Sequence, residues 1–153
     1  MDPLTREAAL EFLAGTSVAH LGVISEGLPY VTPMSFVIEG KRILFRTQAG
    51  RKFDAIAASP SVCIEASSFD ESTGDWVSVI VTGSAHESTD PATGELAVEM
   101  LFEKYAAQIG SPLGVGGLQP MAGMPHVVEV TIENVTGMSS GSGFHARTRP
   151  GRL

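Results

Sequence analysis

The sequence predicts a mainly β protein: a six-stranded antiparallel β-barrel, closed or nearly closed, with short helices at its connections. Two observations predict this class. Six segments of similar length alternate apolar and polar side chains, and the first three follow one another too closely for the crossover helices of a parallel sheet. The expected strands are residues 17–25, 28–39, 42–47, 61–68, 76–86 and 126–135. The 153 residues are expected to form one domain, residues 1–138, followed by a flexible tail, residues 139–153.

Tight turns at Glu26-Gly27 and Gly40-Lys41 are expected to join the first three strands as an antiparallel meander. Pro33 lies in the middle of the second strand (YVTPMSFVI), and because proline cannot donate to a sheet ladder it marks an edge or a bulge. The backbone of residues 32–35 is then free to contact a flat heteroaromatic ligand, although a plain edge strand without a ligand explains Pro33 equally well. One face of this strand is expected to carry Tyr30, Thr32, Met34, Phe36 and Ile38.

Three helices are expected between the strands. Asp2-Pro3 caps the first, residues 4–14, and Pro60 ends the second, residues 51–59. The third spans residues 91–108, and a loop rich in Gly and Pro, residues 110–125, follows it. The last strand is expected to bury Val128, Val130 and Ile132.

The distribution of charge predicts a binding site for a small anion. The net charge is −7, which disfavours a nucleic-acid-binding protein. Between residues 53 and 146 the only Lys or Arg is Lys104, against twelve Asp and Glu residues. Half of the ten Lys and Arg residues instead fall in one short segment: Lys41, Arg42, Arg46, Arg51 and Lys52.

Arg51 and Lys52 stand at the expected start of the second helix, after a strand that ends at Thr47. Cations there oppose the helix macrodipole by about 0.3–1 kcal/mol each. A phosphate would reverse this effect, since it would accept bonds from the first-turn amides and from both side chains. The alternative is that both side chains simply extend into water.

Other chemistries find little support in the sequence. The histidines His20, His86, His126 and His145 show no metal-ligand spacing, so no metal site is expected. The glycines of GVGGLQPMAG follow a helix instead of a strand, which is the wrong context for a dinucleotide fingerprint. No serine lies in a nucleophile-elbow motif, and no catalytic acid or base can be assigned.

The sequence also favours a cytoplasmic location. No apolar run approaches the roughly 18 residues that a membrane span needs, and the polar N-terminus is unlike a secretory signal. A single cysteine allows no internal disulfide, which is typical of a reducing compartment. Cys63 lies in an apolar stretch, SVCIEA, and is expected to be a buried small hydrophobe and not a nucleophile.

Two stretches carry a family resemblance: GLPYVTPMSFVIEGKRILFRTQAGRKFDAIAASPSVCIEA and WVSVIVTGSAHE. In order and spacing they resemble the pyridoxamine 5′-phosphate oxidase-like superfamily, the FMN-binding split barrels. The resemblance covers residues 12–137 and looks closest to the branch of nitroimidazole-reductase-like and flavin- or deazaflavin-dependent reductases. It implies a homodimer with two FMN sites at the subunit interface. The implied site residues are Pro33, Met34 and Ser35 along the isoalloxazine, Arg46 and Thr47 near the ribityl phosphate, Arg51 and Lys52 on the phosphate, and Ser78 completing the site.

The function that this resemblance implies is an FMN-dependent oxidoreductase, with hydride or electron transfer to a small molecule that the sequence does not identify. The C-terminal SSGSGFHARTRPGRL does not match the substrate-binding segment of the true oxidases, and FRTQA lacks the histidine of nitroimidazole-reductase-like members. One alternative is a reductase that uses the deazaflavin coenzyme F-420 on the same fold. Another is a non-enzymatic flavin- or haem-binding protein, for which an axial haem ligand would be sought among His20, His86 and His145.

Overall fold

A computed structural model describes residues 1–109 and 125–141 of the chain. Almost all of the expected Gly-rich loop and most of the expected tail therefore lie outside the described residues. The helices are α1 (Arg6–Ala14), α2 (Arg51–Ala58) and α3 (Pro91–Ile109). The strands are β1 (Asp2–Pro3), β2 (Ala19–Ser25), β3 (Leu28–Met34), β4 (Val37–Glu39), β5 (Arg42–Thr47), β6 (Ser61–Phe69), β7 (Trp76–Glu87) and β8 (His126–Ser139).

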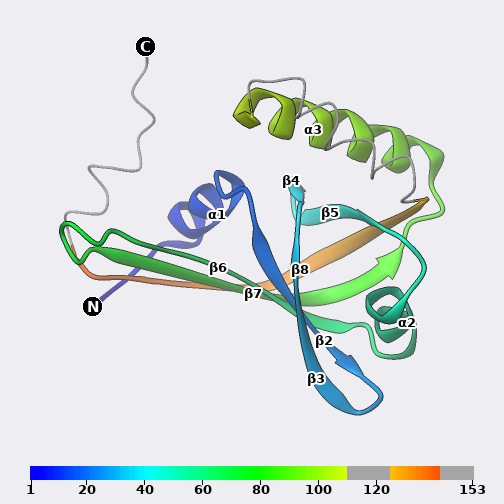
Figure 1. Cartoon of the computed structure of the whole chain (residues 1–153), viewed down its shortest axis with the longest axis horizontal. Helices are drawn as coiled ribbons and strands as arrows, with labels where there is room; N and C mark the ends of the chain where they lie inside the picture. The colour runs from blue at the N-terminus through cyan, green and yellow to red at the C-terminus, as the bar shows by residue number, and fades with distance from the viewer. Residues whose placement is uncertain (110–124, 142–153) are drawn as a thin grey trace.

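All eight strands form one antiparallel sheet in the order β3-β2-β6-β7-β8-β5-β4, with β1 paired to β8 (Figure 1). The two ends of this path, β3 and β4, are consecutive in the chain but do not pair, so the barrel is split between them. Figure 1 shows α3 and the tip of the β2–β3 hairpin on opposite sides of β7 and β8. The expected mainly β, antiparallel split barrel is confirmed, with Pro33 in an edge strand as its missing N–H requires.

The expectation of one continuous strand over residues 28–39 is wrong. The chain leaves β3 at Met34, opposite Ala19, and enters β4 at Val37, opposite Leu44. Phe36 and Val37 are both buried, but against different layers: Phe36 lies in the barrel cluster with Met34, and Val37 packs with Leu44 in the cluster under α3. The expected common face is therefore kept through the break for Tyr30, Met34, Phe36 and Ile38. The break carries the chain across the open side of the barrel, and the expected three-stranded meander is therefore two separate hairpins, β2–β3 and β4–β5.

The two ends of the described chain also differ from the expectation. Asp2 and Pro3 form β1 opposite Ser139 and Met138 of β8, and the cap of α1 is Thr5, whose Oγ1 accepts a hydrogen bond of 3.1 Å from the Ala8 N–H. The last strand continues past residue 135 because β7 is long enough to pair with β8 as far as Ser139. Ser139, which we expected at the start of the tail, is fully buried.

Two buried clusters hold the sheet and helices together. The larger fills the barrel and includes Phe36, Phe45 and Leu13, together with the inward residues of β6, β7 and β8. The smaller joins Leu44 of β5 to Ala97 and Leu101 of α3. Neighbouring residues of β5 therefore face different layers, the barrel interior for Phe45 and α3 for Leu44, as the two-residue period of a strand requires.

The outer face of the sheet carries Cys63, which is exposed and corrects the expectation of a buried thiol. Its neighbours Val62 and Ile64 point into the barrel, so the alternation of β6 turns Cys63 outward. Cys63 lines an open pocket of about 420 Å³ on this face, together with residues of β2, β3 and β7. Among the described residues, no helix is both long and apolar enough to cross a membrane.

Candidate functional site

Helix α2 begins with an N-terminus that no side chain caps. The residue before its first turn is Gly50, which has no side chain to accept a bond, and the first backbone bond of the helix runs from the Asp54 N–H to the Gly50 carbonyl. The N–H groups of residues 51–53 therefore have no acceptor within the helix. Such an N-terminus has the geometry and the partial positive charge to bind an anion.

Arg51 and Lys52 start this helix, as the sequence predicts, and they contact different strands of the barrel. The Arg51 Nε donates a hydrogen bond of 3.0 Å to the Ser25 Oγ, and its guanidinium lies 4.1 Å from the centre of the Tyr30 ring. Lys52 lies over Phe45, with its Nζ 5.6 Å from the ring centre. Burial lowers the pKa of Lys52, because the half-buried ammonium has lost part of its hydration. An anion placed between these two cations would stabilise the charged lysine.

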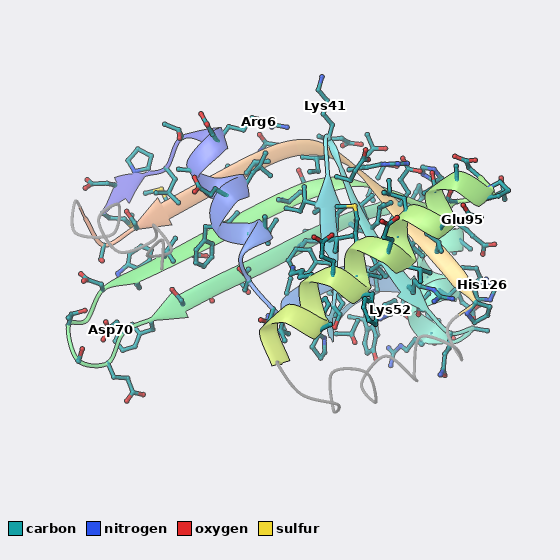
Figure 2. All side chains as sticks on the ribbon, turned by 90° about the horizontal axis from the view of Figure 1, so that it is seen from above. Arg6, Lys41, Lys52, Asp70, Glu95 and His126 are labelled. Atoms are coloured by element: carbon teal, nitrogen blue, oxygen red, sulfur yellow. The ribbon has the colours of Figure 1, made fainter. Side chains whose placement is uncertain are left out.

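The remaining cations of the basic segment are not all part of this site. Arg42 already forms two ion pairs within the chain. Its Nε donates a hydrogen bond of 2.6 Å to the Glu39 carboxylate, and its guanidinium lies 3.3 Å from a carboxylate oxygen of Glu129. Lys41 projects away from the protein at the β4–β5 turn (Figure 2). Across residues 1–109 and 125–141, Arg46, Arg51 and Lys52 form no ion pair with a carboxylate. Lys41 and Arg42 are therefore not part of the candidate anion site, although they belong to the same basic segment of the sequence.

Arg46 lies on the other face of β5 from Phe45, toward α3. It lines an open pocket of about 560 Å³ together with Val127 and residues of α3 that include Glu95 and Glu99. Its Nε is buried and has no hydrogen-bond partner within the described part of the chain, an uncommon state for a charged group. Thr47, the next residue, is buried and faces the barrel. The structure therefore separates Arg46 from Thr47 and Lys52, although all three adjoin the end of β5.

The residues expected along a ring system lie at the edge of the sheet. Pro33 is exposed on the outer face, Met34 is buried, and Ser35 is exposed at the break between β3 and β4. The Met34 side chain faces the barrel interior, so it is not presented on the outer face beside Pro33. Pro33 follows Tyr30 by three residues, which is about 10 Å along a strand. Pro33 is therefore separated along β3 by about this distance from Tyr30, the residue that Arg51 contacts.

Ser78 lies far from the α2 N-terminus within the same chain. It pairs with Met138, whereas Thr47 pairs with His126, twelve residues earlier on β8 and so roughly 40 Å along the strand. Ser78 does share the outer face of the sheet with Pro33. Within one chain the structure brings together Thr47, Arg51 and Lys52, but it does not bring Ser78 to them.

A sequence profile described as pyridoxamine 5′-phosphate oxidase matches residues 5–139. The chain belongs to the pyridoxamine 5′-phosphate oxidase family. A relative in Rhizobium meliloti (strain 1021), an uncharacterized protein, is 30% identical over 90 residues, covering 59% of this chain. That match spans only 58% of the relative's own length.

Solved structures of the same fold include three that overlay most of this family member. A FAD-binding protein from Mesorhizobium loti has a TM-score of 0.71 and 22% identity, over 92% of this chain and 98% of that chain. The flavocytochrome Anf3 from Azotobacter vinelandii has a TM-score of 0.70 and 20% identity, over 92% of this chain and 70% of that chain. A candidate 5-nitroimidazole antibiotic resistance protein from Bacteroides thetaiotaomicron has a TM-score of 0.69 and 17% identity, over 89% and 86%. At these identities the similarity shows the fold alone.

Two residues near the site in this family member were missed by the sequence analysis. Tyr105, in α3, accepts a hydrogen bond of 2.9 Å from the Phe36 N–H and donates one of 2.7 Å to the Ser17 carbonyl. The Lys104 Nζ donates a hydrogen bond of 2.9 Å to the Phe36 carbonyl and lies 3.8 Å from the centre of the Phe36 ring. Together they hold the break at residues 35 and 36, next to the expected ring-binding residues. The isolation of Lys104 within a long acidic segment was the one signal that could have identified it.

Burial perturbs both of these side chains. It lowers the pKa of Lys104 to about 8, while the Phe36 carbonyl and ring favour the charged ammonium and act in the opposite direction. Burial raises the pKa of the Tyr105 hydroxyl, and hydrogen bonds to Phe36 and Ser35 partly offset this. Tyr105 is therefore a neutral donor at physiological pH, and Lys104 is close enough to titration to respond to nearby charge.

Proposed function

We propose that this protein is a flavin-dependent oxidoreductase that binds FMN and reduces or oxidises a small molecule. The observation that carries the proposal is the α2 N-terminus, where Arg51 and Lys52 flank uncapped amides and, within the described chain, form no ion pair with a carboxylate. This arrangement costs free energy unless an anion binds there. A terminal phosphate such as that of FMN fits it.

The same residues suggest how the flavin is held. The first-turn amides, Arg51 and Lys52 bind the phosphate, and the Thr47 hydroxyl lies beside it. Ser35 and the backbone of residues 33–35 lie along the isoalloxazine. Arg46 contributes a third cation from the α3 side, where its buried Nε has no partner among the described residues. The bound flavin supplies the hydride or electron transfer, and the protein positions it and excludes water.

We propose further that the protein is a homodimer, with the outer faces of two sheets packed together. This face exposes large apolar side chains, among them Ile24, Val31 and Ile80, which are 41%, 63% and 44% exposed. Exposed apolar groups that gather on one face favour a protein partner. Ser78 lies on the same face and is too far from the α2 N-terminus of its own chain. In the proposed dimer, Ser78 of the partner subunit completes the flavin site. Sedimentation equilibrium of the purified protein tests the dimer.

The choice of flavin needs a direct comparison. The name of the Mesorhizobium loti protein includes FAD, and that of the Azotobacter vinelandii protein describes a flavocytochrome. Both names support a flavin but do not favour FMN over FAD. The cradle at α2 recognises a phosphate, which FMN, FAD and coenzyme F-420 all carry. Titrations of the purified protein with each of the three, followed by absorption and fluorescence, distinguish them. The proposal expects the tightest binding for FMN.

A double substitution, Arg51→Ala with Lys52→Ala, tests the cradle itself. Hydrogen bonds to charged groups contribute about 1.5–3 kcal/mol each, and solvent screening of the exposed Arg51 favours the low end. We expect a loss of about 3 kcal/mol, or roughly 100-fold in the Kd for FMN. Riboflavin lacks the phosphate, so its affinity should not change.

Lys41→Ala is the matched control, because it removes a cation of the same segment that projects away from the site. The control should bind FMN as the natural protein does. Wild-type FMN affinity in a folded double variant would refute the cradle, and so would an equal loss of affinity for FMN and riboflavin.

A further inference from the structure

A histidine and a carboxylate lie beside Pro33 on the outer face of the sheet. His20 of β2 is directly opposite Pro33 of β3, and on its other side it is opposite Glu65 of β6. Glu65 is in turn opposite Ile80 of β7. Residues directly opposite one another share a face, with Cβ atoms about 4.5–5.5 Å apart. Pro33, His20, Glu65 and Ile80 therefore form one row across the sheet.

His20 and Glu65 interact as a pair. The His20 Nδ1 is 3.4 Å from a carboxylate oxygen of Glu65, and their side chains are 51% and 36% exposed. A carboxylate on Nδ1 orients the imidazole, which leaves Nε2 directed at a ligand.

Among the described residues, few other charged groups lie near His20. From β6 the titratable groups on this face are Glu65 and the thiol of Cys63, and β3 presents only Val31 and Pro33 beside it. Arg51 of α2 approaches β2 at Ser25, at the far end of the strand. From α3, the Tyr105 hydroxyl bonds the backbone carbonyl of Ser17. Glu65 is therefore the charged group of the described residues that contacts His20.

We propose that His20 is the proton donor of the reaction, with Glu65 as its positioning residue. This inference rests on the proposed function, which puts the flavin ring along residues 33–35. The acceptor gains a hydride, with its electron pair, from the reduced flavin, which is thereby oxidised. The His20 Nε2–H bond breaks and its proton passes to the acceptor atom left with the negative charge. The imidazole, now neutral, is protonated again by water, and Glu65 holds its orientation.

The first test follows the histidine resonances of the protein by NMR while FMN is added, without any turnover. The ring signals of His20, assigned by their absence from His20→Gln, should shift as FMN saturates the protein. The signals of His86 should not shift, because it forms its own pair with Glu129 away from the row. Saturable FMN binding that leaves the His20 signals unmoved would overturn the inference while leaving the proposed function intact.

The second test measures the reduction potential of the bound FMN against pH. Negative charge on the reduced flavin favours protonated His20, so reduction of the natural protein should take up additional protons. His20→Gln should lose this additional uptake, Glu65→Gln should make it smaller because the imidazole is no longer held in place, and His86→Gln should keep it unchanged. Identical pH dependence in the natural protein and in His20→Gln, at equal FMN affinity, would refute the role of His20. Failure of the natural protein to bind FMN would instead overturn the proposed function, and with it this inference.

Discussion

The hydroxyl of Tyr105 offers a quantitative test of how the break between β3 and β4 is held. It accepts a hydrogen bond of 2.9 Å from the N–H of Phe36, a residue with 0% exposure, and it donates one to the carbonyl of the exposed Ser17. Tyr105→Phe removes only this oxygen. The Ser17 carbonyl can bond water, but the buried Phe36 N–H is left without an acceptor, which costs about 1–3 kcal/mol. At roughly 2–4 °C per kcal/mol for a chain of this length, a loss of about 2 kcal/mol lowers Tm by roughly 4–8 °C.

Urea denaturation followed by circular dichroism measures this loss in the free energy of unfolding. The dependence of that free energy on urea concentration should be the same in the variant and the natural protein. Tyr30→Phe is the matched control, since the structure gives its hydroxyl no hydrogen bond within residues 1–109 and 125–141 and its ring remains under Arg51. The control should change the free energy of unfolding by less than about 0.5 kcal/mol. If Tyr105→Phe costs no more than Tyr30→Phe, the bond to Phe36 does not hold the break.

Two further predictions concern packing and titration. Gly83 lies at the bulge of β7, where an added Cβ would be 2.3 Å from the Thr131 carbonyl oxygen, so Gly83→Ala should lower the free energy of unfolding measured in urea by about 1–3 kcal/mol. Gly94→Ala in α3 is the control and should stabilise the protein, because its added Cβ would be 4.0 Å from its nearest neighbour. Equal effects of the two substitutions would contradict the close packing at Gly83. Burial lowers the pKa of Lys104 to about 8 from 10.5, so the unfolded chain binds more protons between these values and stability should rise with pH from about 8 to 10. Lys104→Met should make this rise smaller, leaving the part due to Lys52, whereas Lys41→Met should keep all of it; an unchanged rise in Lys104→Met would show that the ammonium is not buried.

The sequence predicted the helices and strands well because their periodicity is local. The alternation in β7 and β8, and the cation pair after Thr47, are visible without any tertiary information. The break at residues 35 and 36 could not be predicted in this way. Apolar residues continue through Met34, Phe36 and Ile38, and the break depends on bonds that Tyr105 and Lys104 make from nearly 70 residues away.

The candidate site was predicted in part for a similar reason. Arg51 and Lys52 take their positions from the helix start, which the sequence marks. The direction of Arg46 depends on which layer covers each face of β5, and that is decided by the packing of α3 against Leu44. His20 and Glu65 were invisible as a pair, because 45 residues separate them and only the β2–β6 register brings them together.

The affinity of the natural protein for FMN, compared with that for riboflavin, tests the central claim most directly. The two molecules share the ring and the ribityl chain and differ only in the phosphate, which the proposal places at the α2 N-terminus. Fluorescence titrations of both should give a Kd for FMN at least roughly 100-fold lower than for riboflavin, the equivalent of about 3 kcal/mol. Equal affinities, or no saturable binding of FMN, would contradict a phosphate cradle formed by Arg51, Lys52 and the first turn of α2.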